Sequence, residues 1–213
     1  MSKYQFQASD IYIPGTDVPK NRLGIEDPSL LHEIEQSLLD QAYQIFTARL
    51  DTNVRFDEDF FKALHYHTFV SLYDWAGVYR TVDMSKGGSL FCLARHLTGA
   101  SQKLFQQLAE ENYLKNPQGW QDQAFAERLA FFQCELIALH PFYELNGRIT
   151  RLFFDLIAIY NGYGPIDYSW ALEQETDLNN AYIQASKDCV QSADNSRLQH
   201  IILGGLSKIK DSE

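Results

Sequence analysis

The sequence predicts an all-α helical bundle with one small β-hairpin. Apolar side chains recur at helical spacing through most of the chain, and only residues 77–92 combine β-prone residues with turn residues. The 213 residues, of which 45% are hydrophobic and 14% aromatic, are enough for one well-buried domain. We therefore expect an N-terminal arm over residues 1–28, packed on the core, followed by a single domain over residues 29–213.

The helices follow from apolar periodicity and from the residues that start and stop a helix. Residues 8–28 contain several Pro and Gly residues and are expected to be extended. A first helix should begin with Ser29 as its N-cap, and a second should follow Asp57 or Asp59 and continue toward Trp75. Further helices are predicted over residues 93–112, after Gly119 to His140, from Asn146 or Gly147 to Gly162, and near residues 174–190 and 195–208.

The predicted hairpin lies among these helices. Residues 78–82 (VYRTV) are β-prone, residues 86–89 (KGGS) favour a turn, and residues 90–92 (LFC) are apolar again. A lone two-stranded hairpin is only marginally stable in water. We therefore expect this segment to be mobile or to pair with a strand of a partner.

Charge and cysteine usage exclude several classes of protein. The formal net charge of -10 disfavours general binding to nucleic acids or anionic membranes, so any polyanion must meet a local basic site. The N-terminus lacks the apolar run of a signal peptide, and no stretch has the 18 or so apolar residues of a membrane span, so a soluble, cytoplasmic protein is expected. Cys92, Cys134 and Cys189 lie far apart without metal-ligand spacing, which favours reduced core thiols.

The segment from His140 to Arg151 joins two apolar helices and yet is rich in charged and polar side chains. The backbone N–H groups at the start of the second helix form a natural anion site. Arg148 and Arg151 share one face of that first turn, where cations oppose the helix dipole at roughly 0.3 to 1 kcal/mol each. A bound polyphosphate would explain this placement.

Two further side chains of this segment suit the chemistry of a polyphosphate. Glu144 would hold Mg²⁺ against the phosphates, because this cation prefers carboxylate and phosphate oxygens. His140 would take a proton from an attacking hydroxyl near neutral pH. The segment therefore predicts a site for a metal-bound nucleotide with a general base beside it.

The same segment resembles the Fic motif, His-x-Phe-x-(Asp/Glu)-Gly-Asn-Gly-Arg-x-x-Arg. The resemblance implies an all-α Fic fold and transfer of AMP from Mg-ATP to Tyr, Thr or Ser of a target protein. It implies that His140 is the general base, that Phe142 anchors the loop and that Glu144 binds Mg²⁺ between the α- and β-phosphates. It assigns the anion hole to Asn146, Gly147 and Arg148, and the γ-phosphate to Arg151.

Leu145 stands where the motif has its first Gly. Its backbone N–H can still donate to phosphate, but a positive φ at Leu would cost on the order of 1 to 2 kcal/mol. An alternative to AMP transfer is therefore a nucleotide-binding regulatory module with little or no turnover. Phosphotransfer, as in the Doc branch, is disfavoured by the resemblance, because both Arg148 and Arg151 are present.

The resemblance extends beyond the motif to partners and to other parts of the chain. The hairpin at residues 77–92 corresponds to the family's flap, where Lys86, Gly87 and Gly88 would dock the target segment by strand-like pairing. Asn179, Tyr182 and Gln191 are candidates to line an adenine pocket.

Regulation is inferred from the same resemblance. Neither Ser169–Glu173 nor Ser29–Glu33 matches the family's inhibitory helix well. The sequence therefore resembles short bacterial toxins whose separate antitoxin supplies an inhibitory Glu, here to Arg151. DNA gyrase or topoisomerase IV is the expected target.

Overall fold

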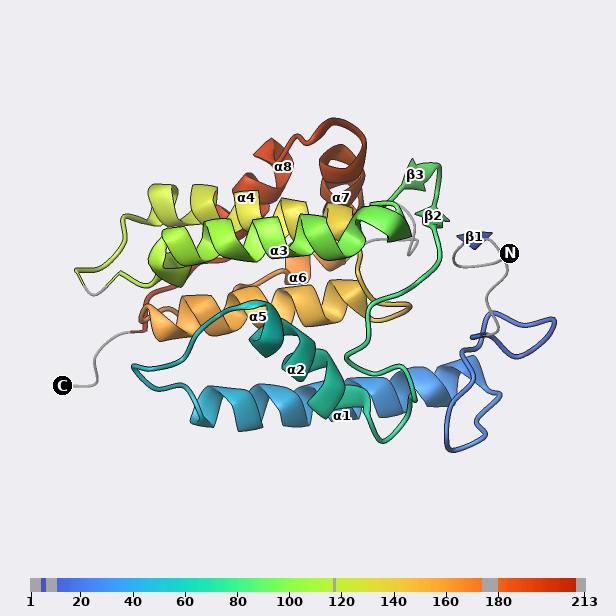
Figure 1. Cartoon of the computed structure of the whole chain (residues 1–213). Helices are drawn as coiled ribbons and strands as arrows, with labels where there is room; N and C mark the ends of the chain where they lie inside the picture. The colour runs from blue at the N-terminus through green and yellow to red at the C-terminus, as the bar shows by residue number, and fades with distance from the viewer. Residues whose placement is uncertain (1–4, 7–10, 117, 174–179, 210–213) are drawn as a thin grey trace.

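A computed structural model gives the structure of residues 5–6, 11–116, 118–173 and 180–209. The chain forms a helical bundle, as predicted, with a small antiparallel sheet at one end (Figure 1). The helices are α1 (Pro28–Ala48), α2 (Glu58–Phe69), α3 (Ala94–Glu110), α4 (Asp122–Leu139), α5 (Asn146–Tyr160), α6 (Ser169–Leu172), α7 (Ala181–Ser192) and α8 (Ser196–Gly205), with a short 3-10 turn at Asn112–Leu114. No helix within these ranges is both long and apolar enough to cross a membrane.

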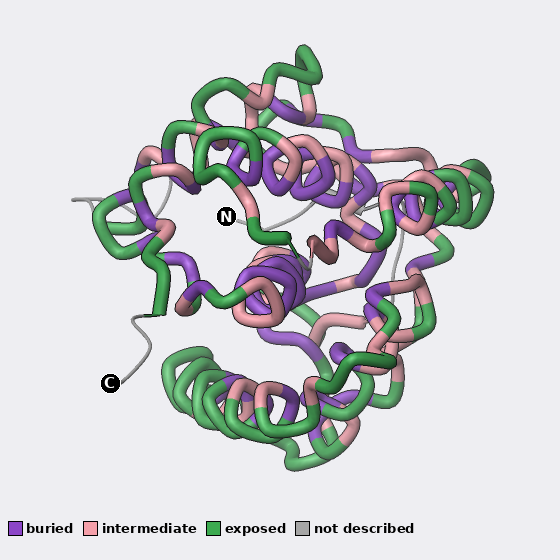
Figure 2. Tube along the Cα trace, turned by 90° about the vertical axis from the view of Figure 1, so that its left-hand side faces the viewer, coloured by how far each residue is buried: buried purple, intermediate pink, exposed green. Residues whose placement is uncertain are grey.

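Helix α5 lies in the middle of the bundle. It packs against α1 and α2 on one side and against α4 on the other, and α7 and α8 cover the far face of α4 (Figure 1). Buried residues are concentrated along these central helices (Figure 2). From Ile149 to Ala158 every residue of α5 except Arg151 is buried, which fixes the start of α5 relative to the rest of the core.

The N-terminus of α1 differs from the prediction. Helix α1 begins at Pro28, and its N-cap is Asp27, whose carboxylate accepts hydrogen bonds from the backbone N–H groups of Ser29 at 2.8 Å and Leu30 at 3.2 Å. Ser29 is therefore not the cap. Proline is well suited to the first position of a helix because its φ is already helical and its missing N–H needs no partner there.

The hairpin is present, but its strands differ from the predicted ones. β2 (Met84–Lys86) pairs with β3 (Ser89–Leu90), and β1 (Gln5–Phe6) from the arm pairs with the other edge of β2. The hairpin is thus part of a three-stranded sheet. Residues 78–82 form no strand, because the backbone there turns at Gly77 (φ 74°) and the N–H of Arg80 donates to the carbonyl of Pro141.

The remaining predicted helices are found with small shifts in their ends. Helix α2 ends at Phe69 instead of continuing toward Trp75, and α7 begins at Ala181. Residues 174–179, where the seventh helix was expected to start, lie outside the described residues. The segment 140–151 thus forms the loop between α4 and α5 and the first turns of α5.

Candidate active site

The loop between α4 and α5 begins and ends with residues in the left-handed conformation. His140 is the C-cap of α4 (φ 45°, ψ 59°), and Leu145 is the N-cap of α5 (φ 68°, ψ 8°). Positive φ is unusual for side chains of this size and persists only where the surroundings hold it. The chain thus turns sharply twice within six residues, as a tight connection between two buried helices requires.

The side chain of Asn146 closes this loop. Its Oδ1 accepts from the backbone N–H of Phe142 at 2.8 Å, and its Nδ2 donates to the carbonyl of Phe142 at 2.7 Å. Phe142 is fully buried and stacks on His65 at 3.9 Å. Because the amide of Asn146 is used within the loop, only its backbone N–H is left to contribute to an anion hole.

His140 lies against the flap. The ring of Phe91, just after β3, stacks on the imidazole with a centroid distance of 3.8 Å and an angle of 12°. Burial lowers the pKa of His140 well below its usual value, and the positive charges of Arg80 and Lys86 lower this pKa further. One ring nitrogen hydrogen-bonds with the backbone of Ile137. The imidazole is therefore neutral at pH 7, which is the form that can accept a proton.

Arg80 connects the flap to the end of α4. Its guanidinium donates to the carbonyls of His140 at 2.8 Å and Leu139 at 3.1 Å, and also to those of Val82 at 2.7 Å and Cys92 at 2.5 Å. The residue is only 2% exposed, and burial lowers the pKa of its side chain. A buried cation needs such a set of acceptors, and here they tie both ends of the flap to the backbone of His140.

Glu144 is buried beside the N-terminal arm. Its Oε1 accepts from the hydroxyl of Tyr12 at 2.5 Å, and its backbone carbonyl lies 3.2 Å from Nε2 of His65. Nδ1 of His65 accepts from the N–H of Gly77 at 2.9 Å, so Nε2 carries the proton and donates to Glu144. His65 thereby links the motif to the segment that leads into the flap.

Glu144 could hold Mg²⁺ only together with oxygen atoms of a bound nucleotide and water. Within the described residues, no group of three His, Cys, Asp or Glu side chains could hold a metal by itself. Mg²⁺ is usually bound by one or two carboxylates together with phosphate oxygens and water. A single carboxylate before the N-terminus of α5 matches that pattern.

Arg148 is held by a glutamate from outside the motif. Its Nη2 donates to Oε2 of Glu35 on α1 at 2.7 Å, and the two side chains are only 15% and 8% exposed. The other carboxylate oxygen of Glu35 accepts from the hydroxyl of Tyr73 at 2.5 Å. Nη1 of Arg148 is buried and has no hydrogen-bond partner within the described part of the chain. An unsatisfied buried donor at a helix N-terminus is suited to an anionic oxygen.

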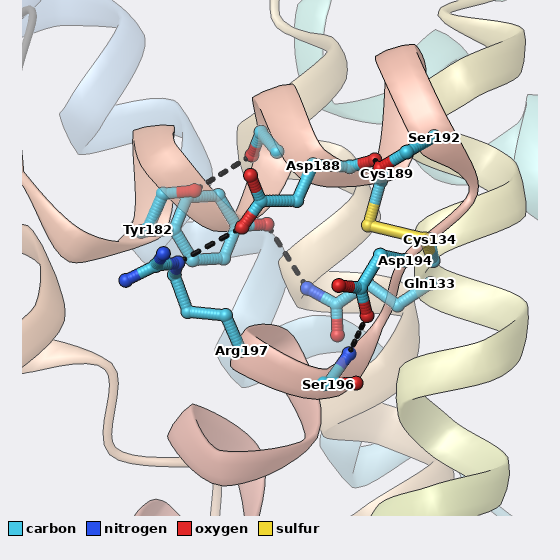
Figure 3. The surroundings of a disulfide bond; sticks show 10 residues. Gln133, Cys134, Tyr182, Asp188, Cys189, Ser192, Asp194, Ser196 and Arg197 are labelled. Carbon is cyan, nitrogen blue, oxygen red and sulfur yellow. Dashed lines mark hydrogen bonds and ion pairs between the residues drawn. A yellow bond between two sulfur atoms is a disulfide. The ribbon is translucent and has the colours of Figure 1, made fainter.

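Arg151 lies one turn further along α5 and is held differently. Its guanidinium is 5.1 Å from the ring centroid of Tyr182 on α7, and the hydroxyl of Tyr182 accepts from Gln133 on α4 at 2.9 Å (Figure 3). Tyr182 thus lies beside Arg151 of the motif. Gln191 instead donates to Ser89 of the flap at 3.0 Å, and Asn179 lies outside the described residues.

The same region corrects the prediction for the cysteines. Cys134 on α4 and Cys189 on α7 form a disulfide, while Cys92 is free (Figure 3). The pair is separated by 55 residues in the sequence, and only the packing of α7 on α4 brings the two Cα atoms to 5.2 Å. Reduced thiols were expected because the cysteines lie far apart in the sequence, but spacing along the chain carries no information about a contact made by helix packing.

The flap presents its turn outward. Gly87 and Gly88 are exposed with positive φ, as the tight turn requires, and Lys86 is close enough to His140 to affect its pKa. The residues predicted for the site therefore lie in a single loop, a single helix N-terminus and the turn above them. Sequence reasoning missed Glu35, Tyr12 and Tyr73 because their contacts with the motif join distant parts of the chain, and it treated Arg80 as part of the β-prone stretch at residues 78–82.

Comparisons with known proteins agree with this architecture. A model of the Fic/DOC family matches residues 55–158. A probable protein adenylyltransferase Fic from Escherichia coli (strain K12) is 32% identical over 209 residues, which cover 97% of each chain. Protein adenylyltransferase VbhT from Bartonella schoenbuchensis is 34% identical over 82% of this chain and 36% of its own length. The crystal structure of the BepC protein from Bartonella tribocorum, with bound AMPPNP, has a TM-score of 0.77 at 22% identity and covers 94% of this chain and 97% of its own.

Proposed function

We propose that this chain, which belongs to the Fic/DOC family and is a protein adenylyltransferase, moves AMP from Mg-ATP to a Tyr, Thr or Ser hydroxyl of a target protein. The observation that carries the proposal is the buried Nη1 of Arg148, which has no hydrogen-bond partner in the described structure and lies in the same short segment as a neutral His140. A phosphate oxygen would satisfy the first group, and an incoming hydroxyl would give its proton to the second.

The reaction requires positioning and charge stabilisation more than covalent participation by the protein. The accepting nitrogen of His140 takes the proton of the target hydroxyl, and the hydroxyl oxygen forms a bond to the α-phosphorus of ATP. The bond from this phosphorus to the oxygen bridging to the β-phosphate breaks, and pyrophosphate leaves. The backbone N–H groups of Gly147 and Arg148 and the guanidinium groups of Arg148 and Arg151 would stabilise the phosphate charge.

Glu144 would hold Mg²⁺, which neutralises phosphate charge when it is bound. The hydroxyl of Tyr12 fixes one oxygen of this carboxylate and so limits its rotation. The flap residues Lys86, Gly87 and Gly88 would align the target segment along the exposed side of the turn, above His140.

The radiolabel of ATP distinguishes the possible reactions. The protein is incubated with Mg²⁺, cell lysate and ATP labelled at the α- or the γ-phosphate, beside a His140→Ala control. AMP transfer predicts protein-bound label from the α-position only, lost in the control and on chelation of the metal. Label from the γ-position alone would indicate phosphotransfer instead.

A nucleotide-binding module without turnover is the second candidate, and the backbone of Leu145 favours it. Leu145 has a φ of 68° at the position where the motif has glycine. Nucleotide binding by calorimetry together with no transfer from either label would support this candidate over the first.

We further propose that the protein is the toxin of a toxin–antitoxin pair. Arg151 makes no ion pair among the described residues, which leaves it available to the inhibitory Glu of a small antitoxin. Co-expression with a neighbouring small open reading frame should yield a stable complex. Purified DNA gyrase and topoisomerase IV are the first targets to test for label, and absence of label on both would exclude them.

A further inference from the structure

Glu35 lies far from the motif in sequence, but its carboxylate engages the motif directly. One oxygen accepts from Arg148 at 2.7 Å, the other accepts from Tyr73 at 2.5 Å, and all three residues are mostly or fully buried. The ring of Tyr73 stacks on Trp75 at 4.4 Å, which fixes the hydroxyl. With both oxygens bonded, the carboxylate has one orientation and so does the guanidinium that it holds.

The way in which Glu35 binds Arg148 leaves one donor available. Glu35 takes Nη2, whereas Nη1 is buried and has no hydrogen-bond partner in the described residues. Leaving a charged donor buried and unsatisfied is costly unless a ligand completes it. Since a guanidinium is planar and rigid, holding Nη2 also restricts the directions in which Nη1 can donate.

We propose that Glu35 is a positioning residue of the nucleotide site, which holds Arg148 so that its Nη1 donates to a phosphate oxygen of ATP. This inference rests on the proposed function, because it requires that the site bind a nucleotide. A simple electrostatic argument predicts the opposite result: removing the negative charge of Glu35 near the phosphates should strengthen nucleotide binding. The two views predict changes of opposite sign.

The experiment measures the dissociation constant of a non-hydrolysable ATP analogue with Mg²⁺ by titration calorimetry. Glu35→Ala should bind roughly 10- to 100-fold more weakly, the range for losing one hydrogen bond to a charged group. Tyr73→Phe keeps the ring and removes only the hydroxyl, so a smaller loss of a few-fold is expected. Glu33→Ala, on the exposed side of the same helix, is the matched control and should bind as the wild type does.

A double-mutant cycle separates positioning from a general effect on the fold. If Glu35 acts through Arg148, then Glu35→Ala should cause little further loss in an Arg148→Ala background. An equal loss in both backgrounds, or tighter binding by Glu35→Ala, would overturn the proposal. Should Glu35→Ala fail to fold, wild-type affinity in Tyr73→Phe would overturn it as well.

The outcomes also distinguish this inference from the proposed function. A wild-type protein that binds no nucleotide contradicts both. Wild-type binding that is unchanged by Glu35→Ala contradicts only the role of Glu35 and leaves AMP transfer standing.

Discussion

Reduction of the Cys134–Cys189 disulfide is expected to destabilise the protein by a measurable amount. The bridge closes a loop in which the two cysteines are 55 residues apart. In the chain-entropy treatment, a loop of this length restricts the unfolded chain enough to contribute about 4 kcal/mol to the free energy of unfolding. With a urea dependence of about 2 to 3 kcal/mol per molar, the unfolding midpoint should fall by roughly 1 to 2 M urea.

The assay is urea unfolding followed by circular dichroism, with and without a phosphine reductant. Cys189→Ala should unfold at the same midpoint in both conditions, close to that of the reduced wild type. Cys92→Ala is the matched control, because Cys92 is free and its loss should leave the full response to reductant.

Counting thiols in the unfolded protein gives an independent result. Without reductant, only one of the three cysteines should be alkylated; after reduction, all three should be. Alkylation of all three without reductant, or an unchanged midpoint on reduction, would refute the reasoning. The packing of α7 on α4 would then be held by side-chain contacts such as Gln133 to Tyr182 alone.

Three further predictions follow from the buried loop and its supports. Leu145→Gly should be more stable than Leu145→Ala by about 1 kcal/mol in urea unfolding, because both lose the buried side chain beyond Cβ and only Gly relieves the positive φ. Equal stability would show that the backbone is not strained there. Arg80→Lys should slow AMP transfer roughly 10- to 100-fold at saturating nucleotide and leave nucleotide affinity unchanged. The reason is that an ammonium group cannot donate to all four carbonyls that Arg80 binds, one of which is the carbonyl of His140. A change in affinity alone would contradict this role. Burial lowers the pKa of His65 to about 3 from the usual 6.5, so the unfolded chain takes up a proton that the folded protein does not. The free energy of unfolding should therefore fall as the pH drops through that window, and His65→Gln should lose less stability between about pH 7 and about pH 4.

The parts of the site that are local in sequence could be predicted from it. His140, Glu144 and the two arginines lie within one loop and one helical turn, so their spacing alone places them together. The hairpin turn at Gly87 was also predictable, because only a turn accommodates two adjacent glycines between short apolar runs.

The parts that depend on tertiary packing could not. Glu35 and Arg148 are 113 residues apart, and a glutamate on an amphipathic helix usually faces water. The strand expected at residues 78–82 is absent for a related reason. Arg80 lies in the middle of this β-prone stretch, and both its backbone N–H and its guanidinium donate hydrogen bonds to the end of α4 and the loop that follows. Asp27 as N-cap was visible in the sequence, because it directly precedes a proline suited to the first helical position.

The conformation of the loop explains why contacts from distant residues are needed to hold it. Left-handed His140 and Leu145 each cost on the order of 1 to 2 kcal/mol, and neither is a glycine. Such a loop persists only if several contacts hold it. Arg80 binds the carbonyl of His140, and His65 binds that of Glu144.

Each of these contacts constrains a different group of the reaction. Arg80 fixes the backbone of His140, the proposed base, His65 fixes the residue that would hold the metal, and Glu35 restrains the guanidinium of Arg148. A folded variant that kept the motif but lost one of these buried side chains should lose one specific step of the proposed reaction: proton removal, metal binding or phosphate binding. Variants at the three positions should therefore differ in which kinetic parameter changes, and a uniform loss across all three would mean that they support only the fold.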